Sequence, residues 1–266
     1  MCDTCGCNIT PGNAHIAQEK NNHGDNAVEV LQNLLSANDR QARHNREHLE
    51  RHGVCCLNLM SSPGSGKTSL LEATIGALAG KLKMAVIEGD LETENDAERI
   101  RAKGIPAIQI TTGSACHLDA HLVHDALHRL DPAELDLLFI ENVGNLVCPA
   151  GFDLGQHANI TLLSVTEGDD KPAKYPVMFR QSDLVLLSKT DLLPHIEEFS
   201  PQRARDHLQQ LANRAPVFEL SAKNGSGMAE WLEWIERGIE QQRQANRLFR
   251  PLASERPPLL SPLGGT

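Results

Sequence analysis

Three cysteines stand within the first seven residues of the chain, in the sequence MCDTCGCN. The thiolates of Cys2, Cys5 and Cys7 can wrap one soft or borderline metal ion, and Gly6 permits the tight backbone bend between them. Removal of Met1 would add a free amine, and an amine with three sulfurs suits square-planar Ni²⁺. A tetrahedral Zn²⁺ site and a redox-active Cys-x-x-Cys are the competing interpretations. We therefore expect a metal site here.

A second group of reactive residues follows an apolar run that begins at Cys55. The loop SSPGSGKT has the composition of a phosphate-binding P-loop between a strand and a helix. Lys67 would reach the outer phosphates of a nucleotide, and Thr68 would offer its hydroxyl to Mg²⁺. Ser61 stands where the usual pattern has its first glycine, which a serine can occupy if its φ stays negative. The residues expected to bind the nucleotide are Pro63, Gly64, Ser65, Gly66, Lys67, Thr68 and Ser69.

Two carboxylates follow expected strands and are candidates for the Mg²⁺ site. Asp90 comes after a strand predicted over 84–87, and Glu141 comes after one predicted over 135–140. Ligands of open α/β sheets lie at the carboxyl ends of the strands, so both side chains should face the P-loop. They would hold Mg²⁺ directly or through water, although each could instead cap the following turn. Glu141 also opens the stretch ENVG, which is typical of a switch that senses the γ-phosphate.

The base of the nucleotide is expected to meet the stretch Ser188-Lys189-Thr190-Asp191. The carboxylate of Asp191 can accept two hydrogen bonds from guanine that adenine cannot supply, and Lys189 can lay its aliphatic stem over the base. The stretch resembles the Asn-Lys-x-Asp element of GTPases, with Ser188 in place of asparagine. The residues that resemble the loop closing over guanine are Ser221, Ala222 and Lys223. Together these elements predict GTP and GDP as ligands.

Cys116, His117 and Cys148 form a second candidate metal site. A metal ion held by these three residues would have one position open for water or a ligand from a second subunit. Cys148 lies shortly after the ENVG switch, so movement of the switch would change the geometry of the metal. A buried thiol with a helix-capping histidine is the alternative.

Two rows of histidines recur at helical spacing outside these sites. His44, His48 and His52 share one expected helix, and His121, His124 and His128 share another. The first row could bind a metal, but we expect a solvated helix face. For the second row we expect surface or dimer-face residues.

An α/β scaffold must position these residues. Strands are predicted over 84–87, 107–110, 135–140, 160–165, 184–187 and 217–220, besides the one before the P-loop; helices are predicted over 27–51, 67–79, 96–103, 117–130, 201–213 and 228–247. This alternation, with short and nearly continuous apolar strands, predicts a mostly parallel sheet with helices on both faces. We expect a metal-binding segment and linker over 1–26, a P-loop GTPase domain with its N-terminal helix over 27–247, and a flexible tail over 248–266.

Composition restricts the function further. The chain has 266 residues, is 40% hydrophobic and carries a formal net charge of −10, which argues against general nucleic-acid binding. It contains no apolar run of 18 residues, so no membrane span is expected. The first residues lack the basic and apolar regions of a signal peptide, so a cytoplasmic protein with cysteine thiols is expected.

Seven motifs carry a resemblance to one family over essentially the whole chain: MCDTCGCN, SSPGSGKT, EGDLETENDAERI, GSACHLDA, FIENVGNLVCPAGFDLG, EGDDKPAKYP and SKTDLLP. The chain resembles HypB, the GTPases that serve nickel insertion into nickel–iron hydrogenase. The resemblance implies a nickel site at the terminal cysteines and a Ni²⁺/Zn²⁺ site at Cys116, His117 and Cys148. It also implies GTP-dependent homodimerisation, a HypA-type nickel chaperone as partner, and the hydrogenase large subunit precursor as recipient.

Our first hypothesis is a GTP-hydrolysing nickel metallochaperone in which Lys67, Thr68, Asp90 and Glu141 serve the reaction. Turnover should be slow, because no residue stands out as a general base. A second hypothesis is an ATP- or GTP-dependent accessory protein for another nickel enzyme, such as urease, or for cobalt delivery; the terminal cysteine cluster argues against urease. A third is a metal sensor or buffer whose P-loop binds nucleotide without hydrolysing it.

Overall fold

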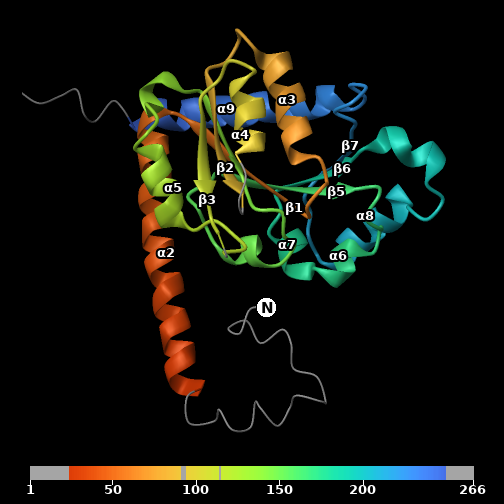
Figure 1. Ribbon diagram of the computed structural model, residues 1–266, viewed down its shortest axis with the longest axis horizontal. Helices are drawn as coiled ribbons and strands as arrows, with labels where there is room; N and C mark the ends of the chain where they lie inside the picture. The colour runs from red at the N-terminus through yellow and green to blue at the C-terminus, as the bar shows by residue number, and fades with distance from the viewer. Residues whose placement is uncertain (1–23, 91–93, 114, 250–266) are drawn as a thin grey trace, which may run out of the picture.

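A seven-stranded sheet, in which every neighbouring pair is parallel, forms the centre of the molecule (Figure 1). The computed structural model describes residues 24–90, 94–113 and 115–249. The strand order is β3-β2-β4-β1-β5-β6-β7. The strands are β1 Cys55–Ser61, β2 Met84–Asp90, β3 Ala107–Thr111, β4 Leu137–Glu141, β5 Ala158–Ser164, β6 Leu184–Ser188 and β7 Val217–Glu219. The expected mostly parallel sheet is confirmed.

The central strand β1 is buried along its whole length, which explains its continuous apolar sequence. Side chains alternate between the two faces of a strand. Leu57 and Leu59 accordingly join one core cluster, whereas Cys56 joins a second cluster on the other face. The P-loop therefore starts from a fully buried strand at the centre of the sheet.

Three helices cover the first face. They are α3 Lys67–Leu78, α4 Asn95–Arg101 and α9 Met228–Phe249, which Figure 1 shows together on one side of the sheet. The fully buried Trp231 of α9 donates its indole N–H to the hydroxyl of Thr74 on α3, with an N–O distance of 2.8 Å. This bond ties the helix that follows the P-loop to the C-terminal helix.

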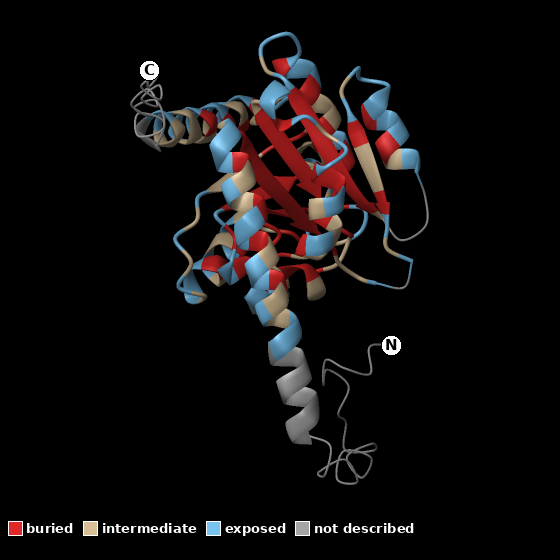
Figure 2. Ribbon diagram, turned by 90° about the vertical axis from the view of Figure 1, so that its left-hand side faces the viewer, coloured by how far each residue is buried: buried red, intermediate tan, exposed pale blue. Residues whose placement is uncertain are grey.

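The other face is covered in two halves. The long helix α2, Gly24–His52, and α5, Ala120–Leu127, pack beside β2 and β4. The short helices α6 Lys171–Lys174 and α7 Pro176–Arg180, with α8 Pro201–Gln210, cover the side of β5 and β6. Figure 2 shows the buried sheet between helices whose outer faces are exposed. Three 3₁₀ turns complete the connections: η1 Pro132–Glu134, η2 Cys148–Gly151 and η3 Thr190–His195.

Buried amides fix α2 to the rest of the molecule. Asn45 is fully buried, and its Nδ2 donates to the carbonyl oxygens of Ala120 at 2.8 Å and Leu154 at 3.1 Å. Arg46, the next residue, forms a two-pronged ion pair with Asp153 at 2.7 and 2.8 Å. The helix is thus anchored to both α5 and the loop before β5.

Two element boundaries differ from the sequence-based expectation for local reasons. The helix expected from His117 begins at Ala120, because the carboxylate of Asp119 caps it by accepting from two backbone N–H groups. The strand expected from Leu135 begins at Leu137, because Pro132 opens a 3₁₀ turn just before it. The short helices α6 and α7 were not expected.

The domain boundaries stay predictions. The expected linker of 1–26 overlaps α2, which begins at Gly24, and the expected tail of 248–266 overlaps the last residues of α9. The remaining parts of these two segments lie outside the described residues. None of the helices in the described ranges combines the length and apolar character needed to cross a membrane.

Candidate functional site

The P-loop joins β1 to α3 and curls through two glycines in left-handed conformations. Gly64 has a φ of 76° and Gly66 a φ of 97°, which side chains other than that of glycine adopt only with strain. The loop lines a cavity of about 420 Å³ whose walls also include Asp90 and Glu141. A helix N-terminus and a glycine-rich turn facing a cavity of this size form a ready anion site.

Ser61 replaces the usual first glycine and has a role of its own. It is fully buried and, as the motif requires of a serine, has a negative φ. Its hydroxyl accepts a hydrogen bond from Nζ of Lys67 at 3.0 Å and donates to the carbonyl of Ser62 at 2.7 Å. The hydroxyl therefore orients the lysine along the loop.

The stretch Ser188–Asp191, expected to meet the base, lies against the P-loop. The hydroxyl of Ser188 donates to the carbonyl of Ser65 at 2.7 Å, and Nζ of Lys189 donates to the carbonyl of Gly64 at 2.6 Å. Lys189 has a φ of 60°, which turns its side chain toward the loop. Ser188, which stands where GTPases have asparagine, thus forms a direct hydrogen bond between the two elements.

A second cavity of about 220 Å³ lies beside this contact. Its walls include Asp191, Ala222 and Lys223, and it shares Gly66 and Lys189 with the P-loop cavity. One carboxylate oxygen of Asp191 accepts from the hydroxyl of Ser221 at 2.6 Å, which fixes the plane of the carboxylate. The expected base-binding residues therefore surround one small cavity adjoining the phosphate cavity.

Three carboxylates gather at the ends of β2 and β4. Glu88, Asp96 and Glu141 each offer an oxygen within 4.8 Å of the others, and Glu141 accepts from the hydroxyl of Thr68 at 2.8 Å. Asp90, which was expected in this role, lines the same cavity but is not part of the cluster. Glu88 was missed, although an acidic residue inside the apolar strand MAVIEGD is a visible signal.

Glu88 is poorly placed to carry a negative charge without a cation. It is buried, and burial together with the nearby charge of Glu141 raises its pKa to about 11. Burial also raises the pKa of Glu141, against the lowering effect of the Lys67 ammonium. The Oε2 atoms of Glu88 and Glu141 are both buried without a hydrogen-bond partner. Oxygen ligands with these properties fit Mg²⁺, for which carboxylates are the usual protein ligands.

Glu167 is a further P-loop contact that the sequence interpretation missed. Its carboxylate accepts from the hydroxyls of Ser62 and Ser65, the latter at 2.6 Å, and from the backbone N–H of Ser164 at 3.1 Å. It follows β5 at the edge of the sheet where Asp90 and Glu141 end β2 and β4, so its position after a strand was the available signal.

The internal metal candidate is brought together as expected. The sulfur atoms of Cys116 and Cys148 and a ring nitrogen of His117 lie within 4.8 Å of one another. The imidazole of His117 stacks on Phe152, with ring centres 3.9 Å apart, and burial lowers its pKa. A neutral imidazole and two half-buried thiols are donors that suit Ni²⁺ and Zn²⁺.

The loop between Glu141 and Cys148 connects the two sites. The backbone N–H of Asn145 donates to the carbonyl of Ser61 at 2.8 Å, and its side-chain Nδ2 donates to the carbonyl of Cys116 at 3.3 Å. A Cβ on Gly144 would lie 2.9 Å from Cα of Pro63, so the loop backbone passes directly over the P-loop. A single residue, Asn145, therefore touches both the phosphate loop and the metal-ligand loop.

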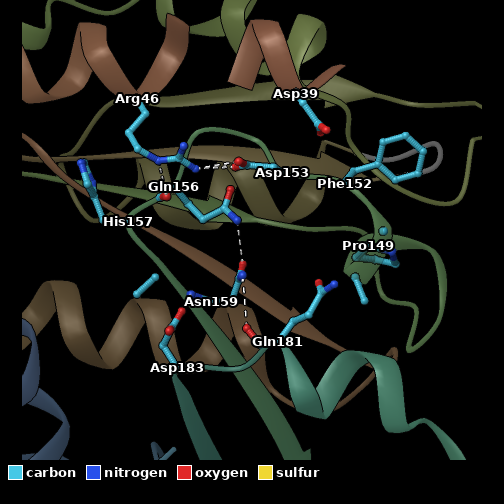
Figure 3. Close-up of a pocket in the computed structure, with 13 residues that line it drawn as sticks. Asp39, Arg46, Pro149, Phe152, Asp153, Gln156, His157, Asn159, Gln181 and Asp183 are labelled. Carbon is cyan, nitrogen blue, oxygen red and sulfur yellow. Dashed lines mark hydrogen bonds and ion pairs between the residues drawn. The ribbon is translucent and has the colours of Figure 1, made fainter. Parts of the chain in front are cut away.

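Another cavity, of about 510 Å³, is lined in part by Phe152 (Figure 3). Its polar residues bind one another: Arg46 pairs with Asp153, and Asn159 accepts from Gln156 at 3.0 Å. It shares no lining residue with the nucleotide cavities. The internal pairing favours a structural role for these residues.

The terminal metal candidate, Cys2, Cys5 and Cys7, lies outside the described residues and stays a prediction. The two histidine rows lie on α2 and on or just after α5, whose helices run side by side in Figure 1.

Comparison with known families gives one match for most of the chain. The family described as "CobW/HypB/UreG, nucleotide-binding domain" matches residues 55–219. A hydrogenase maturation factor HypB from Azotobacter vinelandii is 55% identical over 210 residues, which are 79% of this chain and 69% of the relative.

Two solved structures are similar over the same region. HypB from Helicobacter pylori, described in complex with nickel, superposes with a TM-score of 0.73 at 42% identity, covering 78% of this chain and 96% of the other. The hydrogenase maturation factor HypB from Archaeoglobus fulgidus gives a TM-score of 0.72 at 39% identity, covering 77% of this chain and all of the other.

Proposed function

Because this chain belongs to the HypB family of hydrogenase maturation factors, we propose that it is a GTP-hydrolysing metallochaperone that delivers nickel to nickel–iron hydrogenase. The observation that carries the proposal is Asn145, which contacts the P-loop through its backbone and the Cys116 loop through its side chain. A movement of the loop that carries Asn145 would then affect both the nucleotide site and the internal metal site.

GTP is the proposed nucleotide because of the cavity around Asp191. The fixed carboxylate can accept from two guanine N–H groups, and Lys189 already lies beside the P-loop. Lys67 would stabilise negative charge on the β- and γ-phosphates, and Thr68 with the nearby carboxylates would hold Mg²⁺. Water attacks the γ-phosphorus, the bond to the β,γ-bridging oxygen breaks, and GDP and phosphate leave.

Nickel is the cargo, and Zn²⁺ is the competing occupant of the internal site. Contacts of the γ-phosphate with the loop after Glu141 would order that loop and move Cys148 relative to Cys116 and His117. Hydrolysis would release the loop and change the affinity for the metal. Such coupling requires that the two nucleotide states bind the metal with different affinity.

The proposed partners follow from the family. A HypA-type nickel chaperone would receive the metal, and the hydrogenase large subunit precursor would be its destination. A GTP-dependent homodimer would bring a second subunit to the open position of the internal site. The terminal cysteines would hold nickel separately.

The decisive experiment measures Ni²⁺ affinity at the internal site with GDP and with a non-hydrolysable GTP analogue, in a Cys2→Ser/Cys5→Ser variant that removes the terminal site. We expect the two affinities to differ by about fivefold or more, the lower end of usual allosteric couplings. Equal affinities would mean that the nucleotide does not control the metal.

Phosphate release separates a GTPase from a nucleotide-binding sensor. The protein should hydrolyse GTP slowly, and Lys67→Ala should lose most of that activity, because charge on the outer phosphates is no longer stabilised. Lys103→Ala, which removes an exposed lysine in the turn after α4, is the matched control. Nucleotide binding by the natural protein without phosphate release would favour the sensor.

A further inference from the structure

Histidines from the two separate rows meet on the surface where α2 packs against α5. The ring of His44 on α2 lies edge-on to that of His124 on α5, with centres 5.2 Å apart. His124 and His128 lie one helical turn apart, and their Nε2 atoms are 3.0 Å apart. From the sequence, a solvated helix face was expected for the first row and surface or dimer-face residues for the second, because the pairing of the two helices was not visible.

The hydrogen bonds of Asn45 determine which nitrogen of His124 carries the proton. Nδ2 of Asn45 donates to the carbonyls of Ala120 and Leu154, so its Oδ1 must be the atom that faces Nδ1 of His124, at 3.0 Å. An amide oxygen can only accept, so Nδ1 of His124 is the donor. In the neutral ring, Nε2 then carries a lone pair directed at His128.

This arrangement is the usual one for a metal-binding histidine. One ring nitrogen is held by a hydrogen-bond acceptor, which fixes the tautomer and the ring orientation, while the other is free to bind a metal ion. Asn45 is fully buried and cannot move without breaking its own bonds, so the orientation of His124 is set in advance. Burial and the neighbouring histidines lower the pKa of both His124 and His48, which keeps lone pairs available near neutral pH.

The spacing of the two nitrogens selects the coordination geometry. An ion about 2.1 Å from both Nε2 atoms, a usual metal–imidazole distance, would make an N–metal–N angle of about 90°. That is the angle between neighbouring ligands in square-planar or octahedral sites, which suit Ni²⁺ or Cu²⁺. A tetrahedral Zn²⁺ site would need a wider angle.

We propose that His124 and His128 bind a divalent transition-metal cation with square-planar or octahedral preference, Ni²⁺ in the first instance. The site is distinct from Cys116, His117 and Cys148 and does not depend on nucleotide. It places a third metal-binding position at the surface of the helix that follows His117 in the chain.

The test combines Ni²⁺ binding with residue-level footprinting on the full chain. Equilibrium dialysis with Ni²⁺ alone is performed on the natural protein, on His124→Gln/His128→Gln, and on His195→Gln as a matched control. His195 is exposed and lies on η3, so its substitution removes one histidine from the chain but leaves His124 and His128 unchanged. Diethyl pyrocarbonate, which modifies accessible imidazoles, is applied with and without Ni²⁺, and each modified histidine is identified by mass spectrometry.

We expect the double variant to bind one Ni²⁺ fewer per chain and the control to bind as many as the natural protein. Ni²⁺ should protect His124 and His128 from modification but leave His195 reactive, and this protection should persist in a Cys116→Ser/Cys148→Ser variant. Unchanged stoichiometry in the double variant, or equal modification with and without Ni²⁺, would overturn the proposal.

His124 is half-buried where α5 contacts α2, and His128 is exposed just after α5, so neither substitution changes a core residue, and circular dichroism can verify that the fold is kept. Neither outcome depends on GTP hydrolysis. If nucleotide and metal were found not to be coupled at the internal site, the proposal for His124 and His128 would be unaffected. If His124 and His128 were found not to bind Ni²⁺, the coupling proposal would be unaffected.

Discussion

At the scale of single residues, the nucleotide site depends on carboxylates whose charge is costly in the absence of a cation. Glu88 is buried beside Glu141, and this environment favours its protonated form. The folded protein therefore binds more protons here than the unfolded chain, so stability falls as pH rises above the ordinary range of a glutamate. A bound Mg²⁺ would displace the proton and reverse that preference.

Glu88→Gln should stabilise the nucleotide-free protein at neutral and alkaline pH, because it removes a carboxyl group that must stay protonated. The natural protein should lose up to about 1.4 kcal/mol of stability per pH unit through this group, a slope that the variant lacks. Urea unfolding between pH 6 and 9 measures the difference. Glu134→Gln, at an exposed glutamate, is the control and should keep the slope; parallel curves for the natural protein and Glu88→Gln would show that Glu88 is already ionised.

Asp191 is the residue on which guanine selection is proposed to depend. Asp191→Ala should weaken GTP binding by tenfold or more, since each lost charged hydrogen bond is worth about 1.5–3 kcal/mol. ATP binding should stay as weak as before. Isothermal titration with both nucleotides checks this, with Asp206→Ala on the exposed side of α8 as the control. An equal loss for ATP and GTP would indicate damage to the cavity rather than lost base recognition.

At the scale of elements, one loop determines whether the nucleotide and the metal can influence each other. The segment from Glu141 to Cys148 leaves the sheet, crosses the P-loop at Gly144 and ends in the η2 turn that carries Cys148. Packed interfaces of this kind respond to small shifts, because no space exists to absorb them. The absence of a side chain at Gly144 is what permits the close approach.

Gly144→Ala should push the loop away from the P-loop, because its Cβ would lie 2.9 Å from Cα of Pro63. Overpacking of this kind costs about 1–3 kcal/mol. We expect weaker binding of the GTP analogue and a smaller difference in Ni²⁺ affinity between the two nucleotide states. Gly151→Ala, in the same region but with open space around the added carbon, should change neither. Normal coupling in Gly144→Ala would rule out this loop as the connection.

At the scale of the whole molecule, the sequence predicted the contiguous motifs and the grouping of Cys148 with Cys116 and His117, but it missed other contacts between distant segments. The P-loop, the Ser188–Asp191 stretch and the Cys116–His117 pair are contiguous motifs, and alternation of apolar runs with helical periodicity predicted the parallel sheet. Glu167 is separated by 105 residues from Ser62, and Asn45 by 79 residues from His124. Contacts of that range depend on which helices and strands become neighbours, which no short pattern encodes.

The order of the strands in the sheet was also not predicted from the sequence. The sequence predicted the strands, but not that β4 would lie between β1 and β2. That insertion places Glu141 between Leu59 of β1 and Glu88 of β2, and so brings two of the clustered carboxylates together on neighbouring strands. Asp90 was the sequence-based choice because it follows the strand predicted over 84–87, whereas the pairing of β2 with β4 aligns Glu88 with Glu141.

The hydrogen bond between Trp231 and Thr74 links tryptophan fluorescence to the helix that follows the P-loop. Both tryptophans of the chain lie on α9, and their rings stack with centres 5.8 Å apart. Trp231 reports on the helix that begins with Lys67, while the Cys116 and His124 sites belong to the loop and helix on the opposite face of the sheet. Intrinsic fluorescence should therefore follow nucleotide-driven movement of α3 without a label, and remain largely insensitive to quenching by Ni²⁺ bound on the far side.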